Sequence, residues 1–159
     1  MWLASKEYDS DLLSDMNTVL KPLLASNMFV TFVYAAWTGG ADLAFSSAGH
    51  LPLLHYRMST GDIEERSVSN LPLGILPDQR YTSRTLRFEP GDLLVLVTDG
   101  FTETSDSEER EFGMRVVKET LLAGVSNELR EISGALRDRV LRYGEQRDDQ
   151  TVLLIRRLS

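Results

Sequence analysis

Residues 90–103 read Pro-Gly-Asp-Leu-Leu-Val-Leu-Val-Thr-Asp-Gly-Phe-Thr-Glu, and this stretch dominates our expectation of the fold. Its centre, Leu93–Thr98, is an apolar run of the kind that forms a strand buried on both faces of a sheet. Glu89–Asp92, just before it, has the composition of a tight turn. Asp99 and Gly100 follow the run directly, so we predict a central strand with a carboxylate at its end.

The segments upstream of this strand predict one helix and several further strands. Apolar residues recur at helical spacing from Asp9 to Lys21, where Asp9 or Ser10 can cap the helix and Pro22 ends it. The content of β-branched and aromatic residues then predicts strands at Phe29–Trp37, Leu43–Ala48, Leu53–Arg57 and Arg84–Phe88.

Downstream, the pattern returns to helices. One helix is predicted from Phe112 to Gly124, and a second runs to about Gly144 with Ser126 as its cap. Thr151–Ile155 is predicted as a last buried strand. A run of strands followed by helices indicates an α+β fold, and the absence of repeats and linkers predicts a single domain over residues 1–159.

Composition excludes several classes of protein. The 159 residues include no cysteine and two histidines, which rules out a cysteine nucleophile and a multi-histidine metal site. No apolar run is long enough to span a bilayer and the start lacks signal-peptide features, so we expect a cytoplasmic protein with no membrane partner. The net charge of −7 argues against a nucleic-acid partner. A phosphorylated substrate would need bound cations to offset this charge.

The carboxylates at strand ends are the remaining candidates for chemistry. Asp99 follows one apolar strand, and Asp148 and Asp149 precede another. If these strands are neighbours in one sheet, the side chains converge, and clustered carboxylate oxygens favour Mg²⁺ or Mn²⁺. Simpler interpretations stay open, because Asp99-Gly100 also suits an ordinary turn and an Asp-Asp pair is commonly solvated.

Six blocks together resemble the SpoIIE/RsbU-type branch of the PPM metal-dependent protein serine/threonine phosphatases. They stand in the order of that family and near its usual spacing, and they cover the chain from about Asp9 to its end. The blocks are Phe29–Tyr34, Ser47–Leu54, Leu71–Ile75, Pro90–Glu103, Glu111–Gly113 and Asp148–Thr151.

This resemblance implies an αββα sandwich with two Mn²⁺ or Mg²⁺ ions, where a metal-activated water attacks phosphoserine or phosphothreonine. It places Asp99 and Asp148 among the metal ligands, with Asp149 as a lesser candidate because the family accepts Asn there. His50 falls on a family marker to which we assign no catalytic role. The implied substrate is a phosphorylated regulatory protein, similar to an anti-sigma-factor antagonist, in bacterial stress signalling. A sensor or regulatory domain upstream is a further implied partner.

One family block is absent from this sequence. The family's remaining metal-bridging aspartate lies in a G-D-V-S-G-[HK]-G-like block upstream of the first helix, and the residues before Asp9 are too few to contain it. We therefore expect an N-terminally incomplete sandwich whose metal site and activity are impaired in this chain alone. Missing strands would expose a sheet edge and apolar surface, which a second subunit in a homodimer could cover.

Two alternatives to an active phosphatase follow from this absence and from the weakness of each single block. The first is a non-catalytic regulatory or binding module that keeps the phosphatase fold with an incomplete metal site. The second is an α+β structural domain whose resemblance is coincidental. Binding of Mn²⁺ would distinguish an intact site from the other two.

Overall fold

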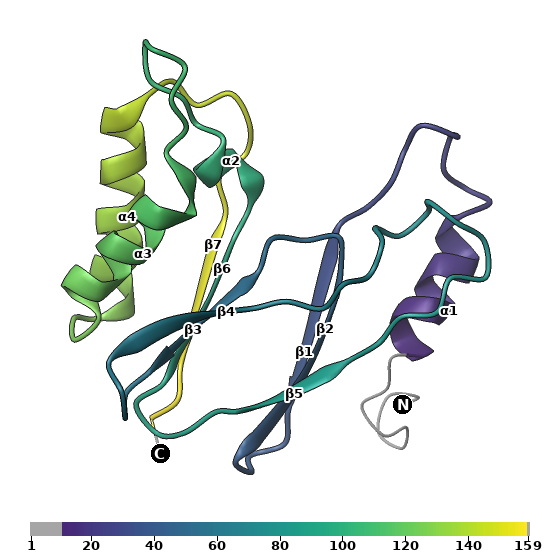
Figure 1. Cartoon of the computed structure of the whole chain (residues 1–159), viewed down its shortest axis with the longest axis horizontal. Coiled ribbons are helices and arrows are strands. Elements are labelled where there is room, and N and C mark those ends of the chain that lie inside the picture. The colour runs from purple at the N-terminus through teal and green to yellow at the C-terminus, as the bar shows by residue number, and fades with distance from the viewer. Residues whose placement is uncertain (1–10, 159) are drawn as a thin grey trace. The chain divides into compact units, whose positions relative to one another are not determined.

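The computed structural model describes residues 11–158 and has the α+β composition that the sequence predicts (Figure 1). The chain divides into two compact units, one made of residues up to His50 with Ser67–Phe88, the other of Leu51–Arg66 with Glu89 to the C-terminus. Each unit contains one β-sheet. Within residues 11–158, no helix has the length and apolar character required to cross a membrane.

The first unit combines helix α1 with a three-stranded antiparallel sheet of order β1-β2-β5. Its elements are α1 (Asp11–Leu20), β1 (Phe32–Trp37), β2 (Asp42–Ala48) and β5 (Arg84–Arg87). The predicted helix is confirmed, whereas its candidate caps Asp9 and Ser10 lie outside the described residues. The first strand begins three residues later than predicted, because Val30 forms an isolated bridge with Leu73 instead.

A buried asparagine fastens α1 to the loop that precedes β5. Asn17 is fully buried, and its side-chain amide donates to the carbonyl of Leu76 at 2.9 Å. Its side-chain oxygen accepts a hydrogen bond from the backbone N–H of Gly74 at 2.8 Å. The apolar side of α1, including Leu13, packs with Leu73 around this contact. The helix therefore fixes the loop by polar as well as apolar contacts.

The second unit holds a four-stranded antiparallel sheet of order β4-β3-β6-β7. Its strands are β3 (Leu53–Arg57), β4 (Asp62–Arg66), β6 (Leu93–Val97) and β7 (Val152–Arg156). Its helices are α2 (Asp99–Thr102), α3 (Gly113–Gly124) and α4 (Leu129–Tyr143), and Figure 1 shows α3 and α4 together beside β6 and β7. Side chains from α3 and α4 form one apolar core with alternate residues of β3 and β6, among them Tyr56 and Val95.

The structure confirms one strand prediction and corrects another. Strand β6 lies between β3 and β7, and four of its five residues are buried, as expected for a central strand. The last strand is not buried as predicted, because β7 is the edge of the sheet and every second residue is exposed. Leu153 is 51% exposed and Ile155 is 40% exposed.

Three further differences concern short elements and caps. Strand β4 pairs with β3 across the turn at Gly61, although the sequence did not predict a strand there. The second C-terminal helix begins at Leu129, with Glu128 and not Ser126 at its N-cap. Helix α2 has four residues, which is too short to show a helical repeat in the sequence.

Candidate active site at the ends of two paired strands

Strands β6 and β7 bring the predicted acidic segments to one end of the sheet. The strands pair antiparallel with Val97 opposite Val152, so the residue that follows β6 and the residues that precede β7 lie at the same end. Asp99 comes two residues after Val97, and Asp148 comes four residues before Val152. The condition set by the sequence, that the two strands are neighbours, is met.

Thr98 fastens the two strand ends to each other. Its backbone N–H donates to the carbonyl of Thr151 at 3.1 Å, and its hydroxyl accepts from the N–H of Thr151 at 2.9 Å. The same hydroxyl donates to the carbonyl of Asp149 at 3.0 Å. Three hydrogen bonds from one residue therefore fix the Asp149–Thr151 backbone against the end of β6.

Gly100 allows this close approach. A Cβ atom at this position would lie 3.0 Å from the carbonyl carbon of Asp149 and 2.4 Å from its carbonyl oxygen, and the second distance is shorter than real Cβ contacts. Asp99 and Gly100 do not form a hairpin turn, the simpler interpretation of the pair, but open helix α2 after Thr98. The glycine is therefore required by packing against the Asp148–Asp149 segment.

The three predicted carboxylates are exposed and carry no basic partner. The Asp99 carboxylate accepts the N–H of Gly100 at 3.0 Å, and the Asp148 carboxylate accepts the N–H of Asp149 at 2.7 Å. Among the residues from 11 to 158, no arginine or lysine forms an ion pair with Asp99, Asp148 or Asp149. Within the described residues, none of the three is therefore held in an ion pair with a cationic side chain.

These residues fit a divalent cation in chemistry but do not complete a site for one. Carboxylate oxygens are the donors that Mn²⁺ and Mg²⁺ take in proteins. However, residues 11–158 contain no group of three or more His, Cys, Asp or Glu side chains placed to hold a metal ion. The role of Asp99, Asp148 and Asp149 as metal ligands therefore stays a prediction, and the described chain supplies at most part of the ligand set.

Gln150 is a supporting residue that the sequence analysis did not single out. Its side-chain amide donates to the carbonyl of Gly100 at 3.2 Å and to the hydroxyl of Thr104 at 3.0 Å. Thr104 in turn donates to the carbonyl of Gly100 at 2.7 Å. The acidic segment and α2 are thereby joined through side chains as well as backbone. The only sequence signal for this role is the position of Gln150 directly after Asp149.

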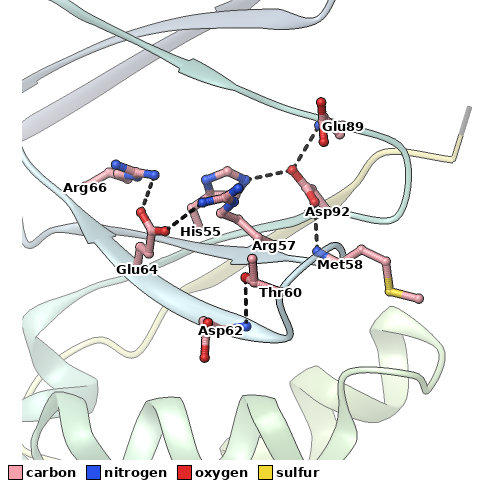
Figure 2. Close-up of polar contacts among 9 residues, drawn as sticks. All are labelled: His55, Arg57, Met58, Thr60, Asp62, Glu64, Arg66, Glu89 and Asp92. Atoms are coloured by element: carbon pink, nitrogen blue, oxygen red, sulfur yellow. Dashed lines mark hydrogen bonds and ion pairs between the residues drawn. The ribbon is translucent and has the colours of Figure 1, made fainter.

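Asp92, the first of the three acidic residues in the 90–103 stretch, has a structural role (Figure 2). It is 3% exposed, and its carboxylate lies 2.9 Å from Nε2 of the buried His55. It also accepts the N–H groups of Met58 and Glu89, both at 2.9 Å. Burial alone raises the pKa of Asp92, but the hydrogen bonds from Glu89, His55 and Met58 outweigh it and hold that pKa below its usual value.

The other histidine, His50, follows β2 in the first unit. It comes directly after Gly49, which has a φ of 66°, and a Cβ on that glycine would lie 2.3 Å from Cγ of Pro72. Gly49 therefore lies against the 70–73 segment, and it donates its N–H to the carbonyl of Asn70 at 3.2 Å. No catalytic role was predicted for His50.

Comparison with known proteins agrees with the resemblance seen in the sequence. The family model described as Stage II sporulation protein E (SpoIIE) matches residues 3–158. The phosphoserine phosphatase RsbU of Bacillus subtilis (strain 168) is 27% identical over 154 residues, which are 94% of this chain and 45% of RsbU. Protein IcfG of Synechocystis sp. is 30% identical over 101 residues, covering 62% of this chain and 16% of IcfG. The chain thus spans less than half the length of these curated relatives.

Solved structures show the same fold. The Mn-presoaked phosphatase domain of SpoIIE from Bacillus subtilis aligns with 99% of this chain and 69% of its own, with a TM-score of 0.69 and 24% identity. The RsbU and RsbW domains of Rv1364c from Mycobacterium tuberculosis align with 98% of this chain and 43% of their own, with a TM-score of 0.79 and 18% identity. With the family model matched over nearly the whole sequence, the chain belongs to the SpoIIE family of serine phosphatase homologues.

Proposed function

We propose that this chain is part of a metal-dependent protein serine/threonine phosphatase. Its substrate would be phosphoserine or phosphothreonine on a regulatory protein similar to an anti-sigma-factor antagonist. Membership of the SpoIIE family and the likeness to RsbU, a phosphoserine phosphatase, support the reaction class. The observation that carries the proposal is the pairing of β6 with β7, which places Asp99 and the Asp148–Asp149 pair at one end of a sheet.

In this proposal Asp99, Asp148 and Asp149 provide the carboxylate oxygens for Mn²⁺ or Mg²⁺. Such ions lower the pKa of bound water and neutralise the charge of the phosphate. This neutralisation is needed because a chain with a net charge of −7 repels a phosphorylated substrate. The protein's own contribution is to hold the acidic segments in place. Thr98 fixes the backbone of Asp149, and Gly100 lets that segment approach α2.

We further propose that residues 1–159 form a single partial phosphatase domain, an αββα sandwich that is incomplete at its N-terminal side. The sequence contains no G-D-V-S-G-like block, and residues 11–158 hold no cluster of three metal-ligating side chains. The same two observations favour a second candidate function, a regulatory module that keeps the fold without catalysis. The two candidates differ in whether the purified chain binds Mn²⁺ and releases phosphate.

The test is phosphate release from an aryl phosphate and from a phosphoserine peptide at saturating Mn²⁺, together with calorimetric titration of Mn²⁺. An active chain should lose at least about a hundredfold in rate in Asp99→Asn, if that carboxylate holds an essential ion. Asp62→Asn is the matched control, because Asp62 is exposed in the same unit at the start of β4. Mn²⁺ binding without phosphate release would favour the regulatory module, and no binding at all would defeat the metal site in this chain.

A further inference from the structure

A cleft of about 700 Å³ lies next to the candidate site, between α4 and the segment that leads into β7. Its volume is within the range of sites that bind ligands. Residues of α4, including Arg130 and Arg137, line one side of the cleft. Gln150 and Thr151, the two residues that follow Asp149, line the other side. Because Gln150 follows Asp149 directly, the cleft begins where the predicted metal ligands end.

The charge of the cleft is opposite to that of the whole chain. Among the ten described residues that line it, two are arginines and none is a carboxylate, whereas the chain carries a net charge of −7. Arg137 forms an exposed ion pair of 3.2 Å with Asp138, a contact that competes weakly with a ligand. Within residues 11–158, Arg130 forms no ion pair. The cleft is therefore suited to an anionic ligand.

Hydrogen bonds within the protein hold the walls of the cleft in place. Gln150 is tied to Gly100 and Thr104, and the amide of Gln146 donates to the carbonyl of Asp148 at 3.0 Å. On the helix side, the hydroxyl of Ser133 donates to the carbonyl of Arg130 at 2.9 Å. A cleft whose walls are fixed before binding loses less conformational freedom when a ligand enters.

The shape of the cleft favours an extended ligand. A second hollow of about 280 Å³ shares Arg130, Ser133 and Val152 with the cleft and continues to Leu154. The hollow thus follows α4 and β7 for part of their length.

We infer that this cleft binds an extended acidic segment of the phosphoprotein substrate, next to the phosphorylated residue, with Arg130 and Arg137 contacting its carboxylates. The inference rests on the proposed function, because the segment belongs to the substrate of that site. Arg130 and Arg137 are recognition residues in this view and take no part in bond cleavage. Recognition of the acidic segment itself needs neither metal nor phosphate.

Binding can therefore be measured apart from catalysis. The probe is a short fluorescein-labelled peptide in which glutamate alternates with serine. Its binding to the full chain is measured by fluorescence anisotropy in the absence of metal. The double variant Arg130→Gln/Arg137→Gln should bind it roughly five- to tenfold more weakly, as expected for the loss of two exposed charge pairs. Added salt should weaken binding to the unmodified chain. Arg115→Gln/Arg142→Gln is the matched control, since both arginines are exposed on α3 and α4 outside the cleft.

Equal affinity of the cleft variant and the control variant overturns the inference, as does equal binding of a peptide with glutamine in place of glutamate. Tighter binding of a single-stranded oligonucleotide through the same arginines, or self-association of the chain that the cleft variant abolishes, also overturns it. A chain that binds the acidic peptide through these arginines but never releases phosphate supports the cleft and defeats catalysis by this chain alone. Unchanged kcat/KM of the cleft variant on an acidic phosphopeptide defeats the cleft and keeps the phosphatase.

Discussion

Thr98 and Thr151 are joined by two hydrogen bonds, one from the N–H of Thr98 to the carbonyl of Thr151 at 3.1 Å and one from the N–H of Thr151 to the hydroxyl of Thr98 at 2.9 Å. The first is an ordinary backbone contact. The second is made by a side chain, which also donates to the carbonyl of Asp149. The threonine at the end of β6 therefore extends the pairing of the two strands into the acidic segment.

We predict that Thr98→Val weakens this junction. The substitution keeps the shape of the side chain but leaves the N–H of Thr151 and the carbonyl of Asp149 without the hydroxyl, which should lower the free energy of unfolding by about 1–2 kcal/mol. Thr98→Ser keeps the hydroxyl and should lose less than about 1 kcal/mol. Urea unfolding followed by circular dichroism measures both. Equal losses in the two variants would contradict a role for the hydroxyl.

Gly100→Ala and Gly134→Ala should change stability in opposite directions. A Cβ at Gly100 meets the carbonyl of Asp149 at 2.4 Å, so the alanine variant should lose about 1–3 kcal/mol and bind Mn²⁺ more weakly if the acidic segment holds the ion. Gly134 lies inside α4, and a Cβ added there would meet nothing within 4 Å, so alanine should add about 0.4–1 kcal/mol. Thermal unfolding of the two variants checks the signs.

Asp92→Asn should destabilise the chain in a pH-dependent way. At pH 7 the loss should be about 3 kcal/mol, because the buried carboxylate accepts hydrogen bonds from His55, Met58 and Glu89. The pKa of Asp92 in the folded chain is lowered, so its stabilising contribution is present above the ordinary carboxyl pKa of about 4 and is lost as the pH falls through the lower folded value. The difference between variant and parent should therefore shrink below about pH 4.

The measurement for Asp92 is the free energy of unfolding of both proteins between neutral pH and acidic pH. Asp62→Asn serves as the control, because Asp62 is exposed at the start of β4 and should give a difference within about 0.5 kcal/mol throughout. If the difference in unfolding free energy between Asp92→Asn and the parent stays constant across the whole pH range, the charge of Asp92 does not contribute through the buried contact.

Asn17→Ala should release the loop before β5 from α1. The substitution leaves the N–H of Gly74 and the carbonyl of Leu76 without the side chain that pairs with both, so we expect a loss of about 2 kcal/mol. Hydrogen exchange should rise at Gly74 more than in β6. Thr18→Ala is the control, because Thr18 is the next residue of α1 and is exposed. It should change the free energy of unfolding by no more than about 0.5 kcal/mol.

The sequence predicted the fold best where the local pattern is itself the cause of the structure. The run Leu93–Val97 predicted a central strand because it has no polar residue to place in water, and β6 lies between two strands. The apolar run Val152–Ile155 led to the same prediction for β7, but that strand is not buried. Composition shows that a strand forms, but the position of that strand in the sheet depends on which other segments pair with it.

The sequence predicted which acidic segments could lie at one end of the sheet, but not the contacts that hold those segments in place. Asp99 and Asp148 were identified as neighbours on the condition that their strands pair, and the structure meets that condition. The contacts of Gln150 with Gly100 and of His55 with Asp92 join residues 50 and 37 positions apart, and no local pattern indicates them. Whether the carboxylates hold an ion stays a prediction, because residues 11–158 do not include a third ligand placed beside them.

The order of the elements has a consequence for how the chain forms during synthesis. Strand β7 follows both α3 and α4, yet its partner β6 precedes them. A nascent chain therefore presents Asp99 at an unpaired strand end until β7 leaves the ribosome, and the long loop must close before the two acidic segments meet. We expect products truncated before residue 148 to retain Asp99 without the Asp148–Asp149 segment that we propose to act with it.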